Sequence, residues 1–176
     1  MRPTPPFNLQ QWIEAHRHAL VPPVANRQVY PAGDFIIMVV GGPNARRDYH
    51  VDPGAELFFQ LEGTLTLKTM QDGRPVDYAV GPGEVFLLPP LLPHSPQRPA
   101  GSVGLVVERR RTAAERDGVQ WYCPGCHALL GEETFPLADI ETELQPVFER
   151  FYSDLARRTC RACGTVLEPP PATPTP

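Results

Sequence analysis

Residues 56–88 read ELFFQLEGTLTLKTMQDGRPVDYAVGPGEVFLL, and this stretch decides the fold class. It alternates short runs of apolar, β-branched and aromatic residues with turn-forming residues. The expected strands are Glu56–Leu61, Thr64–Met70, Val76–Val80 and Glu84–Leu88, and the breaks between them include Gln71-Asp72-Gly73-Arg74 and Gly81-Pro82-Gly83. Runs of this length between such breaks are typical of strands. Short strands that follow one another without intervening helices predict an antiparallel barrel or jelly roll.

The same pattern continues on both sides of this stretch. Asp34–Val40 is expected to form a strand that ends at Gly41-Gly42-Pro43-Asn44, and Val103–Arg109 is expected to form another. The run Arg109-Arg110-Arg111 is interpreted as a solvated strand end. The chain is therefore expected to be mainly β from about residue 28 to residue 111.

A short helix is expected before the barrel and another one after it. Asn8 can cap the first helix, and Pro22-Pro23 ends it. One stripe of this helix would carry Leu9, Trp12, Ile13, His16 and Leu20. The second helix is predicted over Leu137–Tyr152, with a break at Pro146.

These patterns divide the 176 residues into three parts. Residues 1–117 form the barrel with its N-terminal helix, and residues 118–168 form a C-terminal metal-binding segment packed on the barrel. Residues 169–176 are rich in proline and cannot bury enough apolar area to fold, so this tail is expected to be disordered.

Charge and composition exclude several classes of partner. A net charge of −4 argues against a nucleic-acid partner. No apolar run is long enough to span a membrane. Residues 1–6 lack the apolar core of a signal peptide, so a cytoplasmic protein is expected.

Four cysteines form two pairs, Cys123-x-x-Cys126 and Cys160-x-x-Cys163. In a reducing cytoplasm, such pairs favour a bound metal over disulfides. Four thiolates close a tetrahedron, so this site is expected to be structural, and thiolates alone do not distinguish iron from zinc. Gly125 and Gly164 are expected to supply tight turns. His127 could compete as a ligand, but four cysteines already complete the set.

Three other residues could hold a second metal: His50, Glu56 and His94. Two imidazoles and one carboxylate leave coordination positions open, which suits an Fe(II) ion that must bind substrate and O2. A turn at Pro53-Gly54 can bring His50 close to Glu56. Each residue alone has an ordinary alternative: a strand-end histidine in solvent, a carboxylate on a polar face, or a structural histidine.

Three charged residues near these candidates could bind reactants. If residues 46–50 are extended, Arg46 shares the face of His50, whereas Arg47 points to solvent. Arg98 would share the face of His94, and its fork can bind a carboxylate bidentately. Glu108 lies in a strand that is apolar on both faces, so its carboxylate is expected inside and paired. The alternatives are a surface arginine and a strand-end glutamate paired with an arginine.

The two segments that contain these residues resemble the two motifs of the cupin superfamily. The matching positions are His50, Glu56 and Gly63 in the first motif and Gly83, Pro89 and His94 in the second. Asp52 stands where the first motif commonly carries another histidine. This departure favours a site of two histidines and one glutamate.

Longer stretches resemble the 3-hydroxyanthranilate 3,4-dioxygenase family. They are Asn26-Arg27-Gln28-Val29, Gly41-Gly42-Pro43-Asn44, Asp48-Tyr49-His50, Phe86-Leu87-Leu88-Pro89-Pro90 and His94-Ser95-Pro96-Gln97-Arg98-Pro99. The bacterial branch of this family carries a C-terminal extension with two CxxC pairs, as this chain does. The similarity covers nearly everything except the first few residues and the proline-rich tail.

This resemblance implies a cupin double-stranded β-helix barrel with a rubredoxin-like metal knuckle at its C-terminal end. The implied roles are Fe(II) ligation by His50, Glu56 and His94, substrate binding by Arg98, Glu108 and Glu56, O2 orientation by Arg46, and iron or zinc at Cys123, Cys126, Cys160 and Cys163. The implied reaction opens the ring of 3-hydroxyanthranilate with O2, and gives 2-amino-3-carboxymuconate semialdehyde. This product is the precursor of quinolinate in the kynurenine route to NAD. The family is often dimeric, so a homodimer is also implied.

Two other classes of function stay open at this point. The chain could be another cupin dioxygenase that acts on a different carboxylated aromatic compound. It could instead be a binding module without catalysis, either a metal-stabilised cupin or a zinc ribbon that binds nucleic acid, although the acidic charge weighs against the latter.

Overall fold

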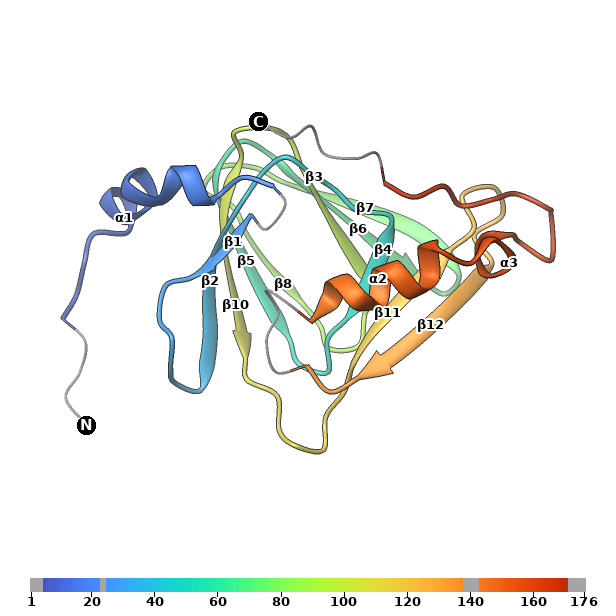
Figure 1. Ribbon diagram of the computed structural model, residues 1–176. Helices are drawn as coiled ribbons and strands as arrows, with labels where there is room; N and C mark the ends of the chain where they lie inside the picture. The colour runs from blue at the N-terminus through green and yellow to red at the C-terminus, as the bar shows by residue number, and fades with distance from the viewer. Residues whose placement is uncertain (1–4, 23–24, 138–142, 171–176) are drawn as a thin grey trace.

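The computed structural model describes residues 5–22, 25–137 and 143–170, and its strands form two antiparallel sheets that face each other (Figure 1). The five-stranded sheet has the order β1 (Asn26–Gln28), β2 (Phe35–Gly41), β10 (Val103–Arg109), β5 (Glu56–Glu62) and β8 (Val85–Leu88). The path through the seven-stranded sheet is β12 (Leu129–Phe135), β11 (Asp117–Tyr122), β4 (Asp48–Val51), β9 (His94–Arg98), β6 (Leu65–Gln71) and β7 (Arg74–Val80). A short strand, β3 (Asn44–Ala45), pairs with β9 beside this path. The mainly β architecture of two antiparallel sheets expected from the sequence is confirmed.

The six strands predicted from the sequence are all present, with ends that differ by at most two residues from the predicted ones. Six more strands complete the sheets: β1, β3, β4, β9, β11 and β12. Of these, β4 agrees with the extended conformation considered for residues 46–50. β9 is harder to predict because it contains Pro96 and mostly polar residues.

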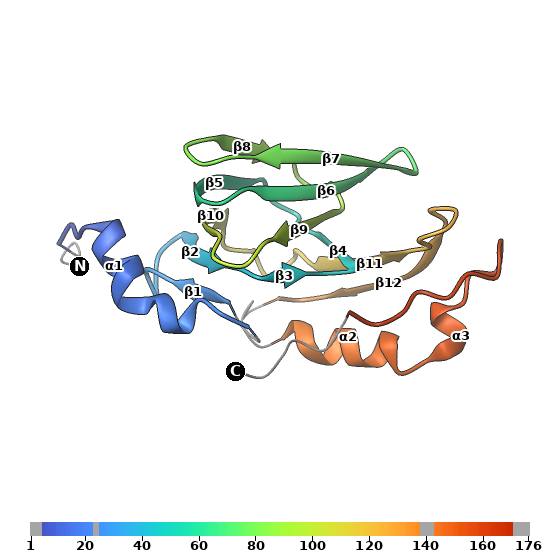
Figure 2. The ribbon, with the colours of Figure 1, turned by 90° about the horizontal axis from the view of Figure 1, so that it is seen from above.

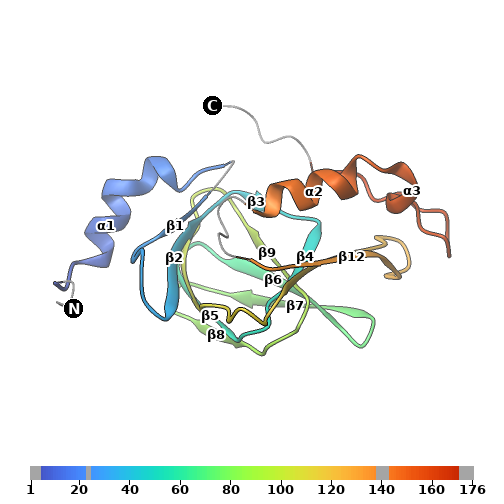
Figure 3. The same ribbon diagram turned by 60° about the horizontal axis from the view of Figure 1, so that its bottom comes forward.

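The strands of the two sheets surround one interior (Figure 3). Apolar side chains fill part of this interior. Strand side chains alternate between the two faces of a sheet, so every second residue of each strand points into this interior. The buried apolar residues that pack together there are Ile36, Met38, Phe58, Leu65, Leu67, Val80, Leu88 and Val106. This core holds the two sheets together and leaves the rest of the interior to polar side chains.

Helix α1 (Leu9–His16) lies against the outside of the five-stranded sheet (Figures 1 and 2). Asn8 caps it as predicted, because its Oδ1 accepts a hydrogen bond from the backbone N–H of Gln11 at 2.9 Å. The helix ends at His16 and continues as one 3-10 turn, Arg17–Ala19, before Pro22. A Cβ on Gly41 would lie 2.0 Å from the Leu20 carbonyl oxygen, so only glycine allows this close approach to β2.

Two helices follow β12: α2 (Leu144–Tyr152) and α3 (Leu155–Arg158). The prediction of a helix from Leu137 with a break at Pro146 is wrong in two respects. Leu137 is not helical, and Pro146 lies in the first turn of α2, where a missing N–H and a fixed φ do no harm. Residues 138–142 of the predicted helix lie outside the described residues. So do residues 171–176 of the proline-rich tail.

Helix α2 lies beside β11 and β12 (Figure 2). It packs on them through an aromatic stack. The rings of Trp121 and Phe151 lie 4.0 Å apart at an angle of 6°, and both side chains are fully buried. Because β11 also pairs with β4, it belongs to the barrel sheet and to the surface that carries α2. The division predicted at residues 117 and 118 falls at the start of this shared strand. No described helix combines the length and the apolar character needed to cross a membrane.

Candidate active site and thiol site

His50, Glu56 and His94 lie side by side inside the barrel, although they come from both sheets. His50 on β4 is the register partner of His94 on β9, and Glu56 begins β5 in the facing sheet. The three residues are 4%, 3% and 2% exposed, and their nearest donor atoms lie within 4.8 Å of one another. The structure thus brings together the three residues that the sequence offered as metal ligands.

The hydrogen bonds of the two imidazoles decide which ring nitrogens face Glu56. Asp117 Oδ2 accepts from His50 Nε2 at 2.8 Å, and the Leu92 carbonyl accepts from His94 Nδ1 at 3.0 Å. The lone pairs that remain are therefore on His50 Nδ1 and His94 Nε2. These atoms lie 3.6 Å and 2.9 Å from Glu56 Oε1.

Glu56 Oε1 is buried and accepts a well-aligned hydrogen bond from no described residue. An oxygen and two imidazole nitrogens thus converge on one point, an arrangement that either protons on the imidazoles or a bound cation would satisfy. Three N/O donors with open positions fit Fe(II) by ligand type and number.

The charges of the three residues are strongly coupled. Burial alone would lower the pKa of His50, but its contacts with Asp117 and Glu56 outweigh this effect and raise the pKa to about 10. Burial would raise the pKa of Glu56, but the two histidines hold it well below its usual range. A divalent cation would displace the protons from the imidazoles, because only neutral imidazole binds a metal.

Arg98 is a buried cation that has a neutral side chain as its partner among the described residues. It is 4% exposed, its Nη1 donates to Gln60 Oε1 at 2.9 Å, and its Nε has no partner. No carboxylate of the described residues lies within ion-pair distance of it. Burial lowers the pKa of Arg98 to about 10, so the guanidinium is still charged at neutral pH. A buried charge of this kind calls for an anion.

Gly104 on β10 leaves the space in which the Arg98 guanidinium lies. A Cβ at residue 104 would be 2.8 Å from Arg98 Nη1 and 2.8 Å from Gln60 Oε1. We expect Gly104→Ala to fold, because the ends of two flexible side chains can move, but to displace the guanidinium. Affinity for a carboxylated ligand should fall by about tenfold. Isothermal titration with the ligand would measure this loss, and Gly73→Ala, in the β6–β7 turn, is the control. Unchanged affinity in Gly104→Ala would contradict the assigned position of Arg98.

Arg111 corrects the interpretation of the arginine run. Its side chain is only 5% exposed, and it pairs with three buried carboxylates, those of Asp52, Glu108 and Asp117. A solvated position was therefore the wrong expectation for Arg111, whereas Arg109 does pair with the surface residue Glu115. The pairing occurs because the chain turns inward after β10 and returns as β11.

Glu108 points into the barrel, as expected from its apolar strand. It is 2% exposed and is the register partner of Glu56. Burial and the charge of Glu56 raise the pKa of Glu108 to about 8, although Arg111 opposes this shift. The Glu108 carboxylate therefore lies beside the candidate metal ligands, where it can bind a proton or accept a hydrogen bond.

Arg46 lies beside β4 and donates two hydrogen bonds to Asp48. Its guanidinium also lies over the ring of Phe148 in α2, at 5.6 Å from the centroid. Arg47 is exposed, in line with its predicted position. Helix α2 thus contacts Arg46, the residue to which the family resemblance gives a role with O2.

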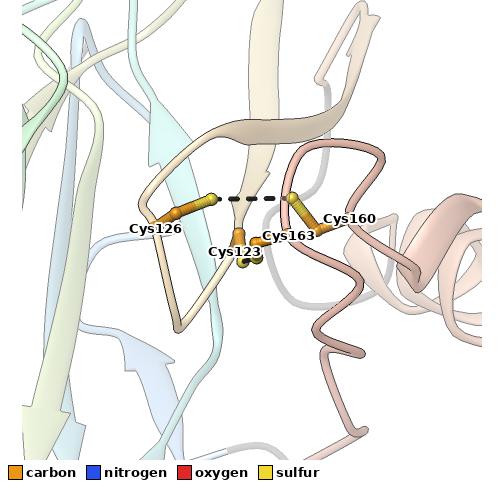
Figure 4. Close-up of side chains that lie close together, drawn as sticks. All are labelled: Cys123, Cys126, Cys160 and Cys163. Carbon is orange, nitrogen blue, oxygen red and sulfur yellow. Dashed lines mark hydrogen bonds between the residues drawn. The ribbon is translucent and has the colours of Figure 1, made fainter.

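The four cysteines form one cluster between two loops (Figure 4). Cys123 Sγ lies 3.4 Å from Cys163 Sγ, and Cys126 Sγ lies 3.6 Å from Cys160 Sγ. Four thiols at this spacing fit a tetrahedral metal, either iron or zinc. The two loops have a similar backbone conformation. In each one, the residue directly after the second cysteine has a positive φ: His127 at 62° and Gly164 at 76°.

Gly125 lies in the turn between Cys123 and Cys126, as expected. Its φ is not among the positive ones, so it makes no left-handed turn. A Cβ there would lie 2.8 Å from Thr165 Oγ1, so Gly125 instead allows the two loops to approach each other. The side chain of His127 is exposed and does not belong to the cluster.

Removing two thiols should loosen the C-terminal segment and spare the barrel. In Cys160→Ser/Cys163→Ser we expect the thiol-bound metal to be lost and β12, α2 and α3 to become mobile. Structural zinc contributes about 10–16 kcal/mol in isolated peptides. A loss of even about 3 kcal/mol would lower Tm by about 6–12 °C. Calorimetry and metal analysis provide the test, with His127→Asn as the control. Iron binding at His50, Glu56 and His94 should persist, and its complete loss would contradict a purely structural thiol site.

Three residues of the barrel site were not indicated by the sequence: Gln60, Arg111 and Asp117. A signal for Asp117 does exist. Asp117, Val119 and Trp121 alternate along β11 and are all buried, so a carboxylate begins an otherwise apolar face. No local pattern distinguishes Arg111 from Arg109 and Arg110.

The sequence matches known proteins along most of its length. The family model described as 3-hydroxyanthranilic acid dioxygenase matches residues 1–152. Two proteins named 3-hydroxyanthranilate 3,4-dioxygenase, from Xanthomonas euvesicatoria pv. vesicatoria and Ruegeria pomeroyi, are 60% and 46% identical to the chain. These alignments cover 95% and 93% of this chain and 94% and 93% of the two relatives.

Among solved structures, a cupin-2 domain containing protein from Shewanella frigidimarina is 18% identical, with a TM-score of 0.45. That match covers 58% of this chain and 100% of the other. The sequence matches alone, from the family model and from the two relatives, carry the assignment. The chain belongs to the 3-hydroxyanthranilic acid dioxygenase family.

Proposed function

We propose that the protein opens the aromatic ring of 3-hydroxyanthranilate with O2 and gives 2-amino-3-carboxymuconate semialdehyde. The ring bond between the carbon that bears the hydroxyl and its neighbour that bears only hydrogen breaks. One oxygen atom of O2 enters the new carboxylate, and the other enters the aldehyde. The observation that carries this proposal is the buried Arg98 guanidinium, which among the described residues donates to the neutral amide of Gln60 and to no carboxylate. A substrate carboxylate is the anion that this cation lacks.

Each residue of the site has a task in this proposal. A ferrous ion held by His50, Glu56 and His94 would supply the redox chemistry with O2. Arg98 binds the substrate carboxylate and so fixes the orientation of the ring. Glu108 accepts a hydrogen bond from the amine or hydroxyl of the substrate, and its raised pKa suits a group that exchanges protons near neutral pH.

Arg46 is the group proposed to orient O2. Its support is the family resemblance and its position on the chain that leads into β4, where Asp48 and His50 are both buried. Phe148 and Asp48 hold the guanidinium from two sides. We propose a structural role for the metal at Cys123, Cys126, Cys160 and Cys163, because four thiolates leave no position for a substrate.

Three further proposals rest on the family alone. The protein would be cytoplasmic, would act as a homodimer, and would supply quinolinate for NAD synthesis. Sedimentation analysis would test the dimer directly, because a monomer at micromolar concentration would exclude a stable one.

The reaction itself can be tested with purified protein loaded with Fe(II). 3-Hydroxyanthranilate in air should give a new near-ultraviolet band, consume one O2 per ring, and incorporate both atoms of labelled O2. Anthranilate, which lacks the hydroxyl, is the matched control and should give no band. Binding of the ring without O2 consumption would instead favour a binding module.

A further inference from the structure

One guanidinium connects the metal ligands to the residue proposed to bind the substrate. Arg111 donates from Nε and Nη2 to both carboxylate oxygens of Asp117, at 2.9 Å to Oδ1 and 2.6 Å to Oδ2. It also donates from Nη1 to Glu108 and from Nη2 to Asp52, the latter at 2.8 Å. All these groups are buried, so water contributes little to their screening.

Asp117 links Arg111 to His50, one of the three candidate metal ligands. It is fully buried, and its Oδ2 accepts from His50 Nε2 at 2.8 Å. This hydrogen bond holds the proton on Nε2 and leaves the lone pair of Nδ1 facing Glu56. Asp117 can keep this orientation only while its own charge is balanced, and Arg111 is the one arginine or lysine among the described residues that forms an ion pair with it.

We propose that Arg111 is a positioning residue for both halves of the site. Through Asp117 it sets the ring nitrogen that His50 offers to the metal, and directly it sets the place of the Glu108 carboxylate. The proposal deepens the proposed function and rests on it for the role of Glu108. Its claim about His50 concerns metal binding and needs no turnover.

The shape of the guanidinium explains why arginine is needed here. Its planar fork reaches three carboxylates from separate segments: Glu108 on β10, Asp117 at the start of β11, and Asp52 between β4 and β5. A lysine ammonium is a single point and cannot form paired bonds in one plane. Loss of the fork would leave buried carboxylates unbalanced, and they would move or bind protons.

Asp117→Asn and Arg111→Lys test the proposal, with Arg109→Lys as the matched control. Arg109 lies two residues away, is partly exposed, and forms its ion pair with Glu115 and not with Asp117 or Glu108. The first readout is the affinity of the barrel site for Co(II), measured by competition with a chelator. Loss of a residue that hydrogen-bonds a metal ligand typically lowers the affinity for the metal by about 10–100-fold. We expect a loss in this range for both variants and no change for Arg109→Lys.

The second readout is anaerobic binding of 3-hydroxyanthranilate to protein saturated with Co(II). Arg111→Lys should weaken this binding, because Glu108 loses its partner, whereas Asp117→Asn should weaken it less. In the double variant, the losses of Co(II) affinity should be less than additive, because both act through His50. Circular dichroism and Tm establish that each variant is folded.

The outcomes separate this proposal from the proposed function. If Co(II) affinity stays within twofold of the parent in folded Arg111→Lys and Asp117→Asn, the positioning role is overturned. Additive losses in the double variant would also overturn it. If Arg111→Lys does not fold, unchanged Co(II) affinity in Asp117→Asn is enough to reject it. Weaker Co(II) binding in a protein that never consumes O2 would support the positioning role and reject the dioxygenase.

Discussion

His94→Ala is expected to abolish ring opening and to lower Fe(II) affinity by more than about a hundredfold. This loss is larger than the usual effect of removing a residue that only hydrogen-bonds a metal ligand. The reason is that an open site has only three protein ligands, and His94 Nε2 is one of the two nitrogens that face Glu56. The fold should persist, because the apolar core does not include this residue. The substitution should cost about 1–3 kcal/mol of stability, as is usual for a buried side chain. Iron content, O2 consumption and circular dichroism should be measured on the same preparation.

His18→Ala provides the matched control for this experiment. His18 is an exposed histidine in the turn after α1, so its removal should leave iron content and turnover unchanged. Near-normal turnover of His94→Ala with bound iron would show that the three residues are not the ligand set.

Arg98→Ala is expected to weaken binding of 3-hydroxyanthranilate by roughly ten- to a hundredfold, since a hydrogen bond to a charged group contributes about 1.5–3 kcal/mol. Iron binding should change little, because Arg98 contacts Gln60 and none of the three candidate ligands. Folding should not suffer, because the buried charge has no counter-charge among the described residues. Anaerobic titration of the iron-loaded protein would measure the affinity.

Two comparisons show whether Arg98 recognises the carboxylate. 2-Aminophenol keeps the hydroxyl and the amine but lacks the carboxylate, so the parent and Arg98→Ala should bind it about equally. Arg47→Ala removes an exposed arginine and should behave as the parent does. An equal loss of affinity for 2-aminophenol in Arg98→Ala would mean that Arg98 supports the pocket without contacting the carboxylate.

Local patterns were sufficient for most of the barrel. Strands such as Thr64–Met70 and Val103–Arg109 alternate or concentrate apolar residues, and glycine and proline mark the turns between them. β9 lacks this pattern because most of its residues are polar and it contains Pro96, and its pairing with β6 and β4 stabilises it. Pairing between distant strands is a tertiary effect that local propensity does not contain.

The predicted metal ligands lie together because two motif segments become neighbouring strands. The residues around them were less predictable. Arg111 was expected in solvent because arginine usually is, and only the return of the chain as β11 brings three carboxylates to it. Pro146 was taken for a break, although the first turn of a helix tolerates proline. Whether His50, Glu56, His94 and Arg98 act as proposed is still a prediction.

The pairing of β4 with β11 also sets an order of events during synthesis. His50, Glu56, His94 and Glu108 leave the ribosome before Asp117, and the second thiol pair follows much later. A nascent chain that ends before β11 holds all three candidate ligands, but nothing yet fixes the ring of His50. The edge of β4 is also open until β11 covers it. We therefore expect the barrel site to bind its metal after β11 has docked, and the thiol loops to close last.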